Sequence, residues 1–244
     1  ANHFLGTNGY VDSPAAEWTL VEQGDGIFAI TADGTNFIGY DGSSSVMSIT
    51  LTDAASANAQ WQFVTKDELL KSLSAASMMN PVDATFFIQG QNFGRNDGRN
   101  TAWQGAPAIG GDNANMNAEK WNCNFDVYQD LAGLPNGFYK VSAQGYYRAG
   151  NGGATSMEQN AYLYAGEAST PLMNINAHAG NAIFNGGNVS DVPGMGIVPN
   201  NMATASAAFS AGLYADNSVF AQVTDGTLRI GIKKDVLIGA DWTI

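Results

Sequence analysis

The sequence is poor in the residue types that several common functions require. Its 244 residues include one cysteine and two histidines. A single cysteine can form neither an intrachain disulfide nor a zinc site built from cysteines, so packing must hold the fold together. No apolar run approaches the roughly 18 residues needed to cross a bilayer, which excludes a membrane-spanning helix.

Basic residues are also scarce, and they are scattered. Ten lysines and arginines stand against 22 acidic residues, which gives a formal net charge of −12. Residues 1–64 contain no lysine or arginine at all. Because a phosphate backbone is bound by clustered basic side chains, the sequence predicts a protein that does not bind nucleic acid.

The residues that are abundant favour a β protein. Hydrophobic residues make up 45% of the chain and the mean hydropathy is −0.12, which is typical of a globular domain with a real core. Only 13% of residues are charged, whereas 29 are glycine. Turn dipeptides such as Asp33-Gly34, Asn136-Gly137 and Asp225-Gly226 tolerate positive φ and close hairpins. We therefore predict an all-β fold.

The first 64 residues contain a weak internal repeat of about 40 residues. Phe4-Leu5-Gly6 precedes Trp18, and Phe37-Ile38-Gly39 precedes Trp61. Such a repeat indicates stacked β units, and a propeller blade or a trefoil lobe would both fit. The two units resemble lobes of ricin-type β-trefoil domains. The resemblance implies a partial trefoil-like domain over 1–64, in which we expect Trp18 and Trp61 to be core anchors.

A helix is predicted to follow, over residues 65–80. Thr65-Lys66-Asp67-Glu68 has the form of a capping box, and Leu69, Leu70, Leu73 and Ala76 then recur at helical spacing. Asn80-Pro81 is the predicted stop. We expect this helix to link two domains. No charged segment followed by an apolar stretch opens the chain, so any export signal is expected to lie outside this sequence.

Strand signals dominate from Pro81 onward. The longest predicted strand is 138–148, along which Tyr139, Val141 and Tyr147 alternate with polar residues, so that one face is core and the other is wet. A sheet with one wet face indicates a sandwich. Other strands are expected at 84–88, 124–128, 161–165, 218–223, 227–233 and 241–244, with a short helix at 202–213.

Residues 81–244 resemble the galactose-binding-like jelly-roll modules of gut-bacterial surface and secreted proteins. The resemblance is carried by 80–88, 92–93, Trp121, 131–141, 145–148 and 240–244. It implies a jelly-roll β-sandwich, carbohydrate binding, and a location outside the cell or on its outer surface. Such modules often hold calcium near the last strand. The sequence has no complete motif for that site, so we expect no cofactor and no metal ligands.

Nothing in the sequence favours an enzyme. His178 lies in a glycine- and asparagine-rich loop, and Cys123 alternates with Phe125, which indicates a buried and inert thiol. Asp126 and Asp130 flank one predicted strand, but sequence spacing does not show that two carboxylates converge as a glycosidase requires. We therefore predict no catalytic residues.

Sugar binding needs a flat ring that stacks on the pyranose and planar polar groups that pair with its hydroxyls. The polar loop around Trp103 and the end of the long strand offer both kinds of group. Trp103 could instead cap the sandwich, and Arg148 could instead pair with an acid while Tyr146 covers the sheet. The candidate ligand-binding residues are Trp103, Tyr146, Arg148, Asn151, Tyr214 and Asp216.

The sequence thus predicts a non-catalytic extracellular protein that binds an oligosaccharide or polysaccharide. The alternative is a structural or adhesive cell-surface module whose ligand is another protein. An exposed apolar patch would favour the adhesive module. Two carboxylates facing each other in a cleft would instead favour an enzyme.

Overall fold

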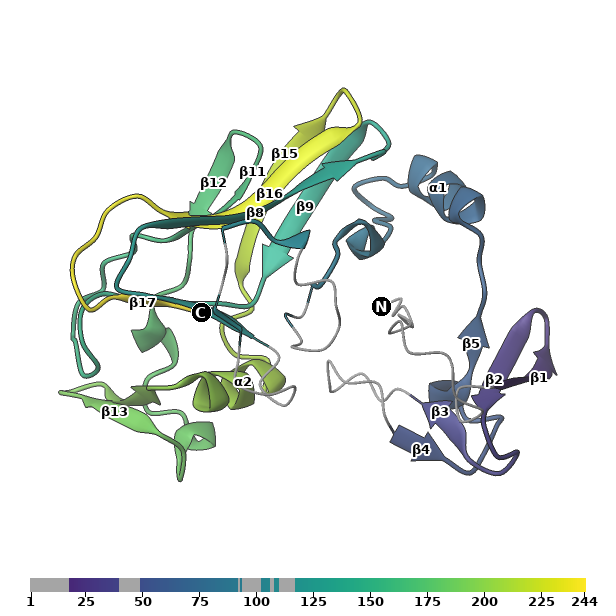
Figure 1. Ribbon diagram of the computed structural model, residues 1–244, viewed down its shortest axis with the longest axis horizontal. Coiled ribbons are helices and arrows are strands. Elements are labelled where there is room, and N and C mark those ends of the chain that lie inside the picture. Colours follow the sequence, from purple (N-terminus) through teal and green to yellow (C-terminus); the bar gives the residue numbers. More distant parts are fainter. Residues whose placement is uncertain (1–17, 40–48, 92, 94–101, 106–107, 110–116) are drawn as a thin grey trace. The chain divides into compact units, whose positions relative to one another are not determined.

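The protein consists of two compact units, Ala1–Ala84 and Thr85–Ile244 (Figure 1). The computed structural model describes residues 18–39, 49–91, 93, 102–105, 108–109 and 117–244. Antiparallel strands make up most of the regular structure in this part of the chain, which holds two α-helices. The predicted all-β class is confirmed.

The first unit is built on one five-stranded antiparallel sheet with the order β1-β2-β3-β4, in which β5 also pairs with β2. Its core is small and centres on Ala29, Phe37 and Ala59. Asp33 shapes the turn between β2 and β3, because its carboxylate accepts the backbone N–H groups of Thr35 and Asn36. The strands are β1 (Thr19–Gly24), β2 (Ile27–Thr31), β3 (Phe37–Gly39), β4 (Ile49–Leu51) and β5 (Trp61–Gln62).

The two tryptophans of the predicted repeat differ in burial. Trp61 is half-buried, and its indole Nε1 donates a hydrogen bond to the carbonyl of Ile38 at 3.0 Å. Trp18 is 51% exposed, so the prediction that it anchors the core is wrong. The reason is its place in the sheet: Trp18 precedes β1, which pairs only with β2 among the described strands.

The predicted capping box is confirmed. Helix α1 (Lys66–Ser74) begins after Thr65, whose hydroxyl accepts the N–H of Glu68 while the Glu68 carboxylate accepts the N–H of Thr65. The helix ends at Ser74, before the predicted stop. Ser77 and Asn80 exchange backbone hydrogen bonds in a turn, and this turn takes the place of the last predicted helical residues.

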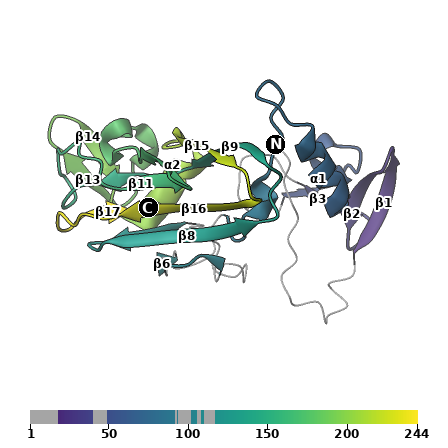
Figure 2. The ribbon, with the colours of Figure 1, turned by 90° about the horizontal axis from the view of Figure 1, so that it is seen from above.

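The second unit has a sandwich-like core between two layers of strands (Figure 2). One layer is a sheet of order β12-β11-β16-β8, and the other is the pair β15-β9. Leu131, Leu163, Val219, Leu228 and Ile230 fill the space between them. These strands are β8 (Phe125–Ala132), β9 (Gly137–Ala143), β11 (Tyr162–Ala165), β12 (Ala168–Pro171), β15 (Asn217–Val223) and β16 (Thr227–Lys234).

The unit has another four-stranded sheet, of order β10-β17-β7-β6, which is called the second sheet below. It borders a separate cluster of buried rings. Tyr146, Phe184, Tyr214 and Trp242 form the centre of this cluster, and helix α2 (Met202–Ser210) contributes Ala205 and Ala208 to it. The strands are β6 (Ala108–Ile109), β7 (Ala118–Trp121), β10 (Tyr147–Arg148) and β17 (Trp242–Thr243), with the hairpin of β13 (Val189–Val192) and β14 (Gly196–Pro199) alongside.

The predicted strand 138–148 is two strands that belong to different sheets. Strand β9 pairs with β15 and β10 pairs with β17. The break occurs at Gly145, where a Cβ atom would lie 2.8 Å from the carbonyl oxygen of Ile244. The predicted alternation therefore holds as far as Gln144 and then fails, because Tyr146, Tyr147 and Arg148 are all buried.

Most other strand predictions in this unit are confirmed, including 161–165, 218–223 and 227–233, as is the helix that begins at Met202. The prediction of a strand at 84–88 is wrong. That segment forms the short 3₁₀ helix η3 (Thr85–Phe87), and Phe87 and Ile88 pack against the sandwich core from there.

A buried ion pair joins the sandwich to the second sheet. Lys234, at the end of β16, donates to Asp241, the residue before β17, at 2.5 Å. The two side chains are 2% and 0% exposed. The same Asp241 oxygen accepts the hydroxyl of Tyr147 on β10 and the N–H of Ile238. One carboxylate therefore fixes β16, β17 and β10 relative to one another.

Breaking this pair should destabilise the protein strongly. We expect Lys234→Met to lower the free energy of unfolding by about 3–5 kcal/mol, because it leaves the Asp241 carboxylate buried without a counter-ion. The matched control is Lys233→Met. Lys233 is the preceding residue, and its 3.7 Å pair with Asp235 is exposed to solvent, so the loss should stay below about 1 kcal/mol. Equal losses in urea unfolding would contradict this role.

The pair also predicts a pH dependence. Burial acts to raise the pKa of Asp241, but the hydrogen bonds from Lys234 and Ile238 outweigh it, and the pKa lies below its usual value. The stabilisation is therefore present above the unfolded pKa of about 3.9 and is lost as the pH falls through the folded pKa. We expect the difference in unfolding free energy between the native protein and Lys234→Met to shrink on acidification. A constant difference would contradict the assignment.

Candidate functional site

The second unit contains a pocket of about 560 Å³ between a sheet and the start of a helix. Strands β7, β10 and β17 supply its sheet side, and the turn that leads into α2 supplies the other side. Asn117, just before β7, ties the two sides together, because its amide donates to the carbonyl of Met202 at 2.8 Å. The lining residues are Glu119, Trp121, Arg148, Asn200, Asn201, Met202, Ala203 and Trp242.

A row of three side chains across the sheet forms one wall. Arg148 on β10 lies opposite Trp242 on β17, which lies opposite Trp121 on β7. Residues that are directly opposite in antiparallel strands project from the same face. The Arg148 guanidinium carbon accordingly lies 5.3 Å from the centre of the Trp121 ring and 5.1 Å from that of Trp242. Both contacts are within the range of a cation–π interaction.

The three side chains of this row differ in exposure. Trp242 is 3% exposed and Arg148 is 4% exposed, whereas Trp121 is 49% exposed. Trp242 belongs to the buried ring cluster and holds the wall in place. Of the three, Trp121 is the one that offers a broad ring surface to a ligand.

Arg148 is oriented by two neutral oxygens. Its Nε donates to the carbonyl of Gly150 at 3.0 Å, and its Nη1 donates to the side-chain oxygen of Asn200 at 2.9 Å. Burial lowers the pKa of the guanidinium, which still stays protonated in water. No carboxylate of the described residues lies within 4.0 Å of it, so the alternative that Arg148 pairs with an acid is not supported there.

Three further polar side chains line the same pocket as the exposed indole: Glu119, Asn200 and Asn201. The indole Nε1 of Trp242 donates a hydrogen bond to Oε2 of Glu119 at 2.7 Å. The other carboxylate oxygen, Oε1, is left to accept a hydrogen bond from a ligand. Asn201 caps α2, because its side-chain oxygen accepts the N–H of Thr204 at 2.9 Å. The amide NH₂ groups of Asn200 and Asn201 have no acceptor among the residues that the structure describes.

Of the six residues predicted from sequence, Arg148 alone lines this pocket. Trp103 packs against the sandwich core, donates to the carbonyl of Gly90 at 2.9 Å and lies 5.0 Å from the Phe93 ring. The alternative that Trp103 caps the sandwich therefore describes it better. Asn151 and Asp216 are exposed, in the turn after β10 and just before β15, and neither lines the pocket.

Tyr146 and Tyr214 must be corrected. Both side chains are 0% exposed, and their rings lie 4.6 Å apart in the second core. Tyr146 turns inward because the strand is interrupted at Gly145, and the Tyr214 hydroxyl donates to the carbonyl of Ile175 at 2.7 Å. Neither ring has a surface that a ligand could reach.

Sequence reasoning missed most of the pocket. The sequence points to Trp121 only through the family resemblance, and none of the motifs singles out Glu119. Their spacing of two residues on one strand was the available signal, because it places both on one face. Nothing in the sequence indicated that Asn200 and Asn201 lie across from that face, since this contact depends on the packing of α2.

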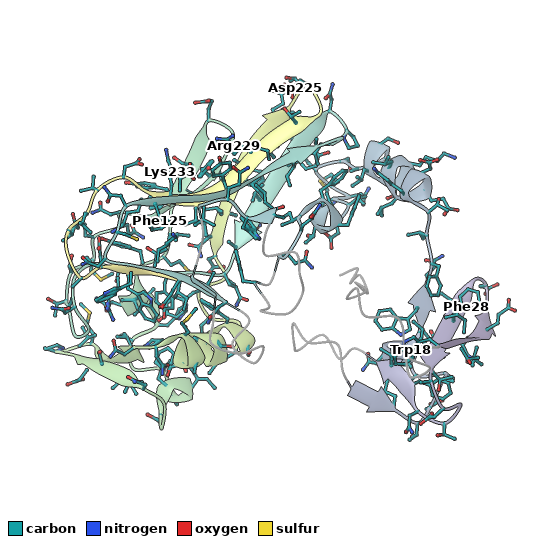
Figure 3. All side chains as sticks on the ribbon, in the orientation of Figure 1. Trp18, Phe28, Phe125, Asp225, Arg229 and Lys233 are labelled. Carbon is teal, nitrogen blue, oxygen red and sulfur yellow. The ribbon has the colours of Figure 1, made fainter. Side chains whose placement is uncertain are left out.

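The residues considered for catalysis lie elsewhere. Asp130 forms a bidentate pair with Arg229, a residue labelled in Figure 3. Asp126 accepts the hydroxyl of Tyr164 at 2.7 Å. His178 is half-buried, with its ring 4.7 Å from that of Tyr214. Cys123 is half-buried in a bend between β7 and β8, and not on the predicted strand.

The described part of the chain contains neither a cluster of metal-ligating residues nor a membrane-spanning helix. No group of three or more histidine, cysteine, aspartate or glutamate residues there is placed to hold a metal ion. None of the helices there combines the length and the apolar character that crossing a membrane would require.

The helix side of the pocket depends on its cap. We expect Asn201→Ala to lower the free energy of unfolding by about 1 kcal/mol, because it removes the acceptor for the N–H of Thr204. Asn201→Ser keeps a capping oxygen and should cost only a few tenths of that amount. Thermal unfolding of both variants tests this, and equal losses would contradict a capping role.

No protein-family model, curated protein or solved structure matches the chain. The function must therefore be argued from the geometry of the pocket.

Proposed function

We propose that the second unit binds carbohydrate in this pocket and carries out no reaction on it. The observation that carries the proposal is a half-exposed tryptophan ring, Trp121, beside a guanidinium, a carboxylate and two amides in one concave site. A pyranose has an apolar C–H face and a rim of hydroxyls. The indole suits the first, and the planar polar groups suit the second.

The polar groups are held in place before any ligand arrives. Arg148 is held by contacts with two rings and two oxygens, Glu119 by the Trp242 indole, and Asn201 by the start of α2. Side chains that are already ordered lose little entropy on binding, which raises affinity for a given set of contacts. This rigidity supports a binding site over a surface that is polar by chance.

The number of carboxylates in the pocket favours binding of a sugar over its hydrolysis. Most glycosidases place two carboxyl groups on either side of the scissile bond. Among the described residues, Glu119 is the one carboxylate that lines the pocket.

The proposal extends to the finer fold, with the second unit as a jelly-roll module and the first as a partial trefoil-like domain. We also propose an extracellular or outer-surface location, which rests on the family resemblance.

A protein-binding or adhesive module is the second candidate function. Phe138 on β9 and Phe220 on β15 are 75% and 64% exposed. Both rings lie on the same, outward face of the two-stranded sheet. Phe220 is directly opposite Lys140, and Lys140 shares a face with Phe138, which is two residues away on β9. Exposed apolar patches mark interaction surfaces, but neither ring lines the pocket, so this surface does not explain the polar groups gathered there.

The central test replaces the stacking ring. We expect Trp121→Ala to weaken glycan binding by at least about tenfold in isothermal titration calorimetry, since stacked aromatic contacts dominate such sites. The ligands would be drawn from a glycan array of plant, mucin and host sugars. Trp18→Ala is the matched control, because Trp18 is 51% exposed but belongs to the other unit.

Two results would contradict the proposal. One is that the native protein binds no sugar on the array or at millimolar ligand in the calorimeter. The other is that Trp121→Ala and Trp18→Ala bind with the same affinity as the native protein, which would place the sugar elsewhere.

A further inference from the structure

The pocket wall contains a buried cation, Arg148, that no acid among the described residues neutralises. Arg148 is 4% exposed, and no carboxylate among the described residues comes within 4.0 Å of its guanidinium. Charged side chains that are removed from water are ordinarily paired, because the loss of hydration is otherwise uncompensated. The two oxygens that Arg148 contacts are a backbone carbonyl and an amide oxygen, and both are neutral.

The guanidinium keeps unused donors at the pocket. Nε and one hydrogen of Nη1 are bound to Gly150 and Asn200. Of its five N–H groups, the two on Nη2 and one on Nη1 therefore have no acceptor in the described part of the chain. Adjacent N–H groups of a guanidinium match the two oxygens of a carboxylate, which they bind in a bidentate fashion.

The position of this cation limits which carboxylate could reach it. The guanidinium carbon lies 5.3 Å from the centre of the exposed Trp121 ring. A pyranose that lies against the part of that ring left open by the guanidinium would have Arg148 beside it, within reach of a carboxylate attached directly to a ring carbon. A neutral hydroxyl at the same place could accept a hydrogen bond but would leave the buried charge uncompensated.

Glu119, the carboxylate that lines the pocket, does not form an ion pair with Arg148. It lies on β7, and Arg148 lies on β10, with β17 between them. Neighbouring strands are about 4.8 Å apart, so the two backbones are separated by roughly twice that spacing. Glu119 is also bound through Oε2 to the Trp242 indole. Its Oε1, which is more than 4.0 Å from the Arg148 nitrogens, is left to accept sugar hydroxyls.

We propose that the pocket recognises an acidic sugar, one that carries a carboxylate on its pyranose ring as uronic and sialic acids do. In this arrangement Trp121 stacks on the ring, Arg148 binds the carboxylate and Glu119 accepts hydroxyls. This inference rests on the proposed function and narrows its ligand class.

The test varies the ligand and leaves the native protein unchanged. Glucuronate, galacturonate and N-acetylneuraminate would each be titrated by calorimetry beside its uncharged amide, which has nearly the same shape. We expect at least one acid to bind about tenfold or more tighter than its amide, as a charge-assisted hydrogen bond predicts. Glucose 6-sulfate tests whether any anion suffices.

The outcomes separate the two proposals. Equal binding of acids and amides, or tighter binding of the sulfate ester, would overturn the acidic-sugar inference and leave carbohydrate binding intact. Binding of neutral sugars alone would do the same. Failure of every sugar, charged and neutral, would overturn both.

A variant adds an independent check. Arg148→Gln removes the charge and keeps a planar polar group, so the ratio of affinity for the acid to affinity for its amide should fall to about one, whatever happens to the two affinities themselves. Near-ultraviolet circular dichroism would show whether this variant is folded. If it is not, the comparison of acid with amide on the native protein still decides the question.

Discussion

The buried pair of Lys234 and Asp241 is the constraint on which the rest of the second unit depends. It joins the last residue of β16, in the sandwich, to the residue before β17, in the second sheet. The next residue, Trp242, then lies between Arg148 and Trp121 in the sheet. A charge pair that has lost its hydration tolerates little movement, since any separation leaves both ions unsolvated. The pocket wall is thereby anchored to the sandwich.

A second consequence is that the pocket combines a rigid wall with an accessible ring. Trp242 and Arg148 are buried and bonded, and Trp121, beside them on β7, is half exposed. The strand break at Gly145 makes this possible, because it turns the chain out of the sandwich and directs Arg148 into the second sheet. Gly145, which interrupts the regular strand pattern, is therefore also the residue that allows Arg148 to reach the pocket wall.

Local patterns in the sequence predicted much of the fold and little of the site. The capping box at Thr65, the strand 227–233 and the helix at Met202 follow from short-range rules, and all three are present. The sequence pattern places Tyr146 on the polar face of one long strand, but Tyr146 is buried. The pattern fails because the strand ends at Gly145, where the backbone comes close to Ile244. The pairing of Trp121 with Trp242 links residues far apart in sequence, and no local pattern encodes it.

The central claim is that Trp121 is the surface on which a sugar lies. The most direct measurement follows the indole N–H signals of the native protein by two-dimensional NMR while an oligosaccharide is added. The account predicts that the signals of Trp121 and its neighbour Trp242 shift together, with those of Trp18, Trp61 and Trp103 unchanged. Shifts at Trp103 or Trp18 with none at Trp121 would contradict it.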